Sequence, residues 1–173
     1  MPRRLSLTLL AALALLLAAC ATAVRVDAAG DVHAFLTAVR NDDRASFEQH
    51  VDRPALKAQL ETRLLELSRA RNPSPGERLA ASVLAGPAAK MAADTLIQPR
   101  VFRVAAEYFG YSPTTPIPNR LAIAGALRYR PDGRVCVIAK QKGACLFVFT
   151  NEGGVWKLTG FEGDLGDLKG VLR

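Results

Sequence analysis

The chain has 173 residues, of which 23 are basic and 16 acidic, giving a formal net charge of +7. This length leaves room for one domain of ordinary size and excludes two separate cores. No run of Lys and Arg is interleaved with aromatic residues, as a nucleic-acid-binding strip would require, so we expect no nucleic acid partner.

The N-terminus has the layout of a secretory signal peptide. Arg3 and Arg4 precede an apolar run from Leu5 to Ala19 that consists almost wholly of Leu and Ala. As a helix, this run spans about 22 Å, which is short of the ~30 Å hydrocarbon core of a bilayer. The sequence therefore predicts a cleaved signal peptide over residues 1–19 and not a transmembrane helix.

Cys20 follows the apolar run directly, after Leu17-Ala18-Ala19. This string resembles the bacterial lipobox, in which the cysteine thiol takes a diacylglyceryl group before signal peptidase II cuts on its N-terminal side. The resemblance implies that Cys20 is lipidated and that membrane lipid is a partner through the acyl anchor. Because residue 21 is Ala and not Asp, it further implies the outer membrane of the cell envelope, facing the periplasm. The alternative is cleavage after Ala21-Thr22-Ala23, which leaves a soluble periplasmic protein.

Residues 20–30 are rich in small residues and lack a steady period, so we interpret them as the lipidated cysteine and a flexible tether. Ten flexible residues reach about 17 to 19 Å, which keeps the domain close to the bilayer. A single domain is predicted over 31–173. With Arg3 and Arg4 removed, the mature chain has 21 basic and 16 acidic residues, or +5.

The first part of the domain, 31–110, carries helical patterns. Asp31 is placed to cap a helix with an apolar stripe at i, i+3, i+4 and i+7. Asn41-Asp42-Asp43 predicts a turn and a new cap, and Asp52 predicts the cap of a third helix with Pro54 in its first turn.

Further helices are predicted towards residue 110. Ser74-Pro75-Gly76-Glu77 has the spacing of a capping box, and the Ala-rich helix that follows is interrupted at Gly86-Pro87. The last helix is expected from Pro99 to Phe109, ending at Gly110.

The character of the chain changes after residue 120, where glycines recur every ten residues and strand-forming residues lie between them. The strands are expected near 125–130, 134–140, 144–150 and 154–161. We therefore predict an α+β fold, with an N-terminal group of about five short helices followed by a four-stranded antiparallel β-meander over 125–161. Trp156 is interpreted as a core residue.

Cys136 and Cys145 lie on two neighbouring strands, in a compartment where a pair of cysteines suggests a disulfide. The predicted register places Cys136 opposite Arg128 and Val148, and Val148 opposite Trp156, so that Cys145 falls on the other face. Opposite faces would forbid the bridge and favour two buried thiols. A loop one residue longer or shorter would place both cysteines on one face, so the disulfide remains an open alternative.

The stretch FLTAVRNDDRASFEQHVDRPALKAQL resembles the opening of a bacterial family known as domain of unknown function 2939. Three stretches carry the resemblance over residues 31–162: Val51–Lys57, Leu96–Pro99 and Val155–Thr159. Arg53 differs from the family pattern, in which an aromatic residue often follows Val-Asp. The resemblance supports the domain boundaries given above. It implies no activity, because none is established for the family.

One cluster of side chains in the sequence could perform acid–base chemistry, namely His50 with Glu48 and Asp52. Asp52 as a helix cap and His50 at a helix end account for it without catalysis. No metal-binding, phosphate-binding or nucleophile motif is present, so no catalytic residue, metal or cofactor is predicted. We expect a non-catalytic envelope lipoprotein acting as a binding or structural module for an envelope protein or an apolar ligand. The alternative is a small envelope hydrolase or isomerase using His50 and Asp52 in a pocket.

Overall fold

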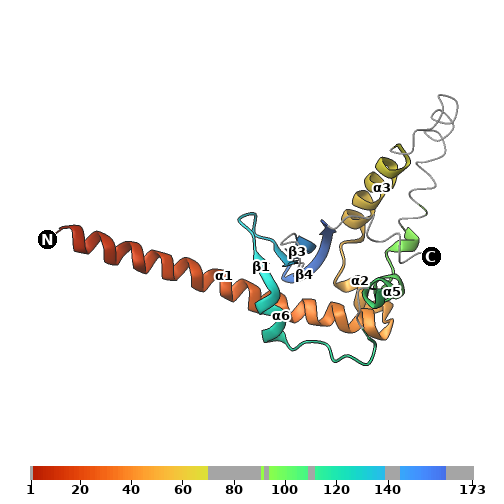
Figure 1. Cartoon of the computed structure of the whole chain (residues 1–173), viewed down its shortest axis with the longest axis horizontal. Helices are drawn as coiled ribbons and strands as arrows, with labels where there is room; N and C mark the ends of the chain where they lie inside the picture. The colour runs from red at the N-terminus through yellow and green to blue at the C-terminus, as the bar shows by residue number, and fades with distance from the viewer. Residues whose placement is uncertain (1, 70–90, 92–93, 109–111, 139–144, 163–173) are drawn as a thin grey trace.

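A computed structural model of the chain describes residues 2–69, 91, 94–108, 112–138 and 145–162, and describes the side chains of its first helix from Ala21 onward. Its helices are α1 (Pro2–Asn41), α2 (Arg44–Gln49), α3 (Arg53–Arg69), α5 (Pro99–Tyr108) and α6 (Arg120–Ala126). Its strands are β1 (Leu127–Tyr129), β2 (Val135–Ile138), β3 (Cys145–Glu152) and β4 (Val155–Phe161). The strands form one antiparallel sheet in the order β1-β2-β3-β4, which confirms the predicted α+β fold (Figure 1).

Helix α1 is longer than predicted, because it continues without a break through residues 20–30. This segment is therefore not a flexible tether in the structure, and Asp31 lies inside a helix instead of capping one. The physical reason is that the apolar stripe extends backwards from Val32 through Ala28 to Val24, at helical spacing, and packs on the core. The N-terminal half of α1 extends away from all other elements, whereas its C-terminal half packs against the domain (Figure 1).

The two short polar segments after α1 cap helices as predicted. The Asp43 side chain accepts a hydrogen bond from the backbone N–H of Ser46 at 3.1 Å, and this bond starts α2. The Asp52 side chain accepts one from the backbone N–H of Ala55 at 3.0 Å, at the start of α3. The predicted capping box at Ser74-Pro75-Gly76-Glu77 and the Ala-rich helix lie outside the described residues.

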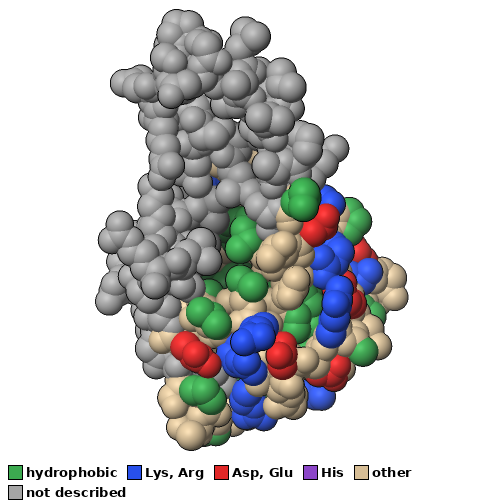
Figure 2. All heavy atoms as spheres, turned by 90° about the vertical axis from the view of Figure 1, so that its right-hand side faces the viewer, with side chains coloured by type: hydrophobic (Ala, Val, Ile, Leu, Met, Phe, Trp, Pro, Cys, Tyr) green, Lys and Arg blue, Asp and Glu red, His purple; other side chains and the backbone are tan. Residues whose placement is uncertain are grey.

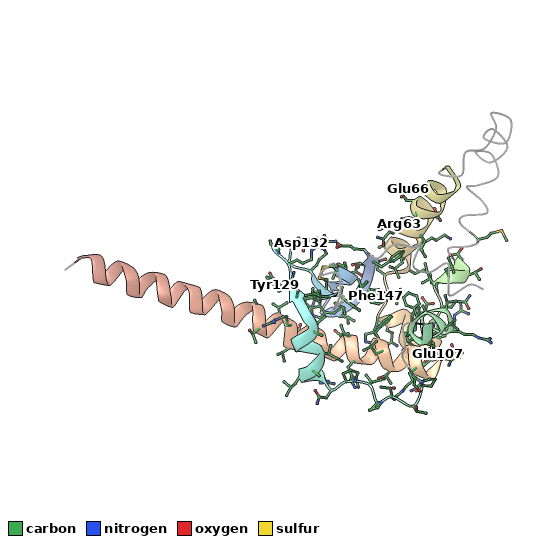
Figure 3. All side chains as sticks on the ribbon, in the orientation of Figure 1. Arg63, Glu66, Glu107, Tyr129, Asp132 and Phe147 are labelled. Atoms are coloured by element: carbon green, nitrogen blue, oxygen red, sulfur yellow. A yellow bond between two sulfur atoms is a disulfide. The ribbon has the colours of Figure 1, made fainter. Side chains whose placement is uncertain are left out.

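The core lies where α1, α2 and α5 meet the sheet. The ring of Phe35 on α1 is 5.7 Å from that of Phe47 on α2 and 5.8 Å from that of Phe149 on β3, between ring centroids. Phe102 on α5 completes the aromatic group, and Phe147 lies between the sheet and α5 (Figure 3). Trp156 is also buried, as predicted.

Helix α6 is absent from the sequence-based prediction, which places the first strand from residue 125. The Asn119 side chain accepts a hydrogen bond from the N–H of Ala122 at 2.9 Å and caps this helix directly after a proline-rich loop. Ile123 and Ala124 are buried, and α6 packs on α1. Strand β1 is correspondingly short and forms one edge of the sheet.

The turn at Gly133 forms as predicted, with Arg130 paired to Arg134 and a positive φ of 82° at the glycine. The β3–β4 turn differs from the prediction, because Gly153 and Gly154 both adopt positive φ and form a two-residue turn. Together with a bulge between Val148 and Phe149, this turn shifts the register, so that Val148 lies opposite Gly160 and not opposite Trp156.

The prediction that Cys136 and Cys145 lie on opposite faces is wrong. Cys136 pairs with Arg128 and Val148 as expected, but a bulge after Val137 places Ile138 opposite Cys145. Because Ile138 and Cys136 share a face, the bulge brings both cysteines to that face, where they form a disulfide with a Cα–Cα distance of 5.5 Å. The bulge thus changes the register in the same way as a loop one residue longer or shorter, which was the condition given above for a disulfide.

Within the described part of the chain, no helix is both long enough and apolar enough to cross a membrane.

Candidate functional site

His50 and Asp52, the pair named in the sequence analysis, each contact other groups in the structure. The His50 ring lies at the end of α2, with Nδ1 at 2.8 Å from the carbonyl oxygen of Ser46 and Nε2 at 3.6 Å from Oδ1 of Asp31. The Asp52 side chain instead caps α3. Backbone hydrogen bonds from this segment to Leu158 fix both residues beside β4. The structure therefore gives each side chain a separate structural partner.

Two carboxylates of α1 hold Trp156 from one side. Asp27 accepts a hydrogen bond from the indole Nε1–H at 2.8 Å, and Asp31 accepts one from the backbone N–H of Trp156, also at 2.8 Å. The two Asp residues are one helical turn apart, so they present adjacent carboxylates to β4. Since Trp156 is only 4% exposed, this arrangement is a clamp between α1 and β4 and not an accessible site.

The described residues also include no group of three or more His, Cys, Asp or Glu side chains that could hold a metal ion. In this geometry His50 contacts Ser46 and Asp31, and the two Asp residues of α1 contact Trp156.

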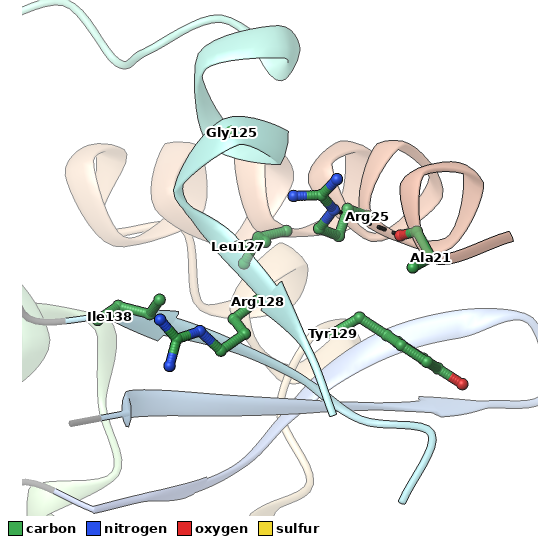
Figure 4. A pocket seen from close by; sticks show the side chains of 7 residues that line it. All are labelled: Ala21, Arg25, Gly125, Leu127, Arg128, Tyr129 and Ile138. Carbon is green, nitrogen blue, oxygen red and sulfur yellow. Dashed lines mark hydrogen bonds between the residues drawn. The ribbon is translucent and has the colours of Figure 1, made fainter. Parts of the chain in front are cut away.

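A different region, between α1 and the edge strand β1, is hollowed. We call it the α1–β1 pocket, and its volume is about 380 Å³. Its lining residues come from α1, α6, β1 and β2: Ala21, Arg25, Gly125, Leu127, Arg128, Tyr129 and Ile138. Tyr129 extends from β1 on the side of Ala21, and Arg128 extends on the side of Ile138 (Figure 4).

The lining of the α1–β1 pocket is cationic and apolar, with no carboxylate. The Arg25 guanidinium donates to the carbonyl oxygen of Ala21 at 3.3 Å and to the Thr22 hydroxyl at 3.1 Å, so it stays along its own helix. Among the described residues, neither Arg25 nor Arg128 forms an ion pair with an acidic side chain. The pocket therefore suits an anionic group with an apolar neighbour.

The opposite end of the domain, around α2, α3 and α5, has a different charge pattern. Lys and Arg side chains lie among Asp and Glu side chains on this face (Figure 2). Lys57 Nζ is 2.5 Å from Oδ2 of Asp94, and Arg53 pairs with Glu48 while donating to the carbonyl oxygen of Ile97 at 2.8 Å.

The hydrogen bond from Arg53 holds the pKa of the Glu48 carboxyl below its usual value. Through these contacts Arg53 also ties α3 to α2 and to the segment before α5. Arg53 and Lys57 at this end are therefore neutralised by neighbouring carboxylates.

Sequence reasoning missed the α1–β1 pocket because its members lie far apart in the chain. Arg25 lies in the segment interpreted as a tether, and Arg128 is one of many scattered charges. Only the apolar spacing from Val24 to Val32 indicates that α1 begins before Asp31. Nothing in the sequence indicates that α6 brings β1 alongside that helix.

The fold and these sites define a small α+β domain built on a long N-terminal helix. The chain belongs to a family described as protein of unknown function (DUF2939), whose match covers residues 12–105. The match includes Val51–Lys57 and Leu96–Pro99, two of the three stretches on which the resemblance was based, and ends before the sheet. Comparison with curated proteins and with solved structures gives no match.

Proposed function

We propose that this protein is a non-catalytic lipoprotein of the cell envelope, acylated on Cys20, that serves as a binding or structural module at the membrane. The observation that carries the proposal is the string Leu17-Ala18-Ala19-Cys20 at the end of an apolar run that follows two arginines. The proposed location is the outer membrane, facing the periplasm, because residue 21 is Ala and not Asp.

The course of α1 supports this proposal. The apolar N-terminal half of α1 extends away from the domain, so its removal would leave the fold's contacts in place (Figure 1). Cys20 lies just before the packed half, because Val24 already contacts the core. The four residue-to-residue steps from Cys20 to Val24 span about 6 Å as a helix and at most about 14 Å when extended. A lipid on Cys20 would thus hold the domain directly against the bilayer.

An anchor of this kind has a simple energetic basis. Each buried CH₂ group contributes about 0.8 kcal/mol, so one acyl chain holds a protein only marginally, whereas two or more give stable attachment. A diacylglyceryl cysteine meets this requirement without a transmembrane helix.

The geometry of His50 and Asp52 does not favour the enzymatic alternative. The Asp52 carboxylate caps α3, and the His50 ring is held between Ser46 and Asp31 at 12% side-chain exposure. Neither residue lines the α1–β1 pocket. A binding or structural role therefore remains the proposed function, and the described pocket favours an anionic ligand over a purely apolar one.

Metabolic labelling with an alkyne-bearing palmitate tests the proposal in bacterial cells that express the full chain. We expect the wild type to incorporate the label and to migrate as the shortened mature form. Cys20→Ala should carry no label and should keep precursor length, because signal peptidase II acts on the lipidated cysteine. Cys136→Ala serves as the matched control and should incorporate label like the wild type.

Two results would contradict the proposal. One is an unlabelled wild-type chain that is shortened normally. The other is labelling that persists in Cys20→Ala, which would place the acyl group elsewhere.

A further inference from the structure

We propose that the α1–β1 pocket is the membrane-facing site of this protein and binds the phosphate group of an anionic phospholipid in the bilayer that holds the anchor. This inference rests on the proposed lipidation of Cys20. It goes further by assigning a ligand class and an orientation of the domain on the membrane.

The position of the pocket is the first argument. Ala21 lines it and follows Cys20 directly, so their Cα atoms are about 3.8 Å apart. Arg25 lies one turn further along the same face of α1. Tyr129 lies on the side of the domain from which the N-terminal half of α1 extends (Figure 3). A glycerol-linked cysteine lies at headgroup depth, so the near rim of the pocket lies there as well.

The charge of the pocket is the second argument. A guanidinium has five N–H donors in a planar fork that suits phosphate oxygens. Arg25 uses two donor contacts within its own helix, and Arg128 is exposed with no acidic partner among the described residues. At the other end of the domain, Arg53 and Lys57 are instead paired with carboxylates. The two arginines of the pocket are therefore available to an anionic group.

The side chains around the pocket are the third argument. Tyr129 is 39% exposed and combines an apolar ring with a polar hydroxyl, a combination suited to the interface between water and lipid. Leu121 on α6 is 76% exposed and lies one turn before Gly125, which lines the pocket. An exposed leucine one turn from a pocket whose two arginines have no acidic partner among the described residues fits a surface that contacts both headgroups and the first part of the acyl chains.

The test uses the full lipidated chain with Leu121→Cys, labelled with an environment-sensitive fluorophore and reconstituted into vesicles. The native Cys136–Cys145 disulfide and the acylated Cys20 leave the new thiol as the reactive one. Vesicles of phosphatidylcholine alone are compared with vesicles containing 30% phosphatidylglycerol. Accessibility of the fluorophore is measured by quenching with acrylamide, which is uncharged and is not repelled by anionic lipid, and attachment of the chain is measured separately by flotation.

In anionic vesicles we expect the quenching constant to fall at least threefold, because each basic residue near an anionic surface strengthens the contact by about fivefold. Arg25→Glu with Arg128→Glu should restore quenching to its level in phosphatidylcholine while flotation stays complete. The matched control, Arg44→Glu with Arg100→Glu at the far end of the domain, changes charge equally and should leave the fluorophore protected.

The outcomes separate the inference from the proposed function. A chain that floats fully but shows equal quenching in both kinds of vesicle would overturn the inference and leave the anchor intact. Protection that is equal in both vesicles and insensitive to Arg25→Glu with Arg128→Glu would also overturn it, since the contact would then be apolar only. A wild-type chain that carries no lipid and fails to float would instead contradict the proposed function.

Discussion

Trp156 shows how single side chains join the N-terminal helix to the last strand. Its indole and its backbone N–H each donate to a carboxylate of α1, Asp27 and Asp31 respectively. Asp31 also faces the His50 ring, so one carboxylate connects α1 with β4 and with the end of α2. A buried N–H group without an acceptor is costly, and these contacts should therefore contribute to the stability of the fold.

We predict that Asp31→Ala lowers the free energy of unfolding by about 1–3 kcal/mol, because it removes the acceptor of a buried N–H. Urea denaturation followed by the fluorescence of Trp156, the single tryptophan, measures this change. Asp31→Asn keeps an acceptor oxygen and should lose less. Asp94→Ala removes an exposed ion pair with Lys57 and should cost about 0–1 kcal/mol. Equal losses for Asp31→Ala and Asp94→Ala would contradict the clamp.

At this scale the sequence predicts caps better than long-range partners. Asp43 and Asp52 are recognisable because a cap and its target lie three residues apart in the chain. The acceptors of Trp156 are 125 and 129 residues away from it, so no local pattern identifies them. Asp31 even carries a misleading local signal, because it precedes an apolar stripe and resembles a cap.

At the scale of elements, the register of the sheet depends on local irregularities in its strands and turns. The bulge between β2 and β3 brings Cys145 to the face of Cys136, and the paired glycines 153 and 154 shift β4 against β3. The strand positions follow from composition and glycine spacing. The register does not, because one additional residue in a strand moves every side chain beyond it to the other face.

We predict that reduction of the Cys136–Cys145 disulfide lowers the free energy of unfolding by about 2–3 kcal/mol, from the chain entropy of a short closed loop. Urea denaturation with and without dithiothreitol measures the loss. The double variant Cys136→Ala with Cys145→Ala should be less stable than the wild type and insensitive to dithiothreitol. A wild type whose two thiols are alkylated equally before and after reduction would show that the bridge is absent.

At the scale of the whole molecule, α1 combines an apolar half that extends outwards with a half that belongs to the core (Figure 1). The family match spans both halves, since it starts at residue 12 and runs to residue 105. The α+β class and the order of helices before strands are predictable from the sequence, because periodicity changes clearly after residue 120. The α1–β1 pocket is not, because it depends on how α6 places β1 against α1.

The central claim is that the mature chain begins at a lipidated Cys20, within about one helical turn of the folded domain. Mass spectrometry of the N-terminal peptide from the membrane-purified protein tests it most directly. We predict a peptide that starts at Cys20 and carries the added mass of a diacylglyceryl group. A peptide that starts at an unmodified Val24, or one that retains residues 1–19, would contradict the claim.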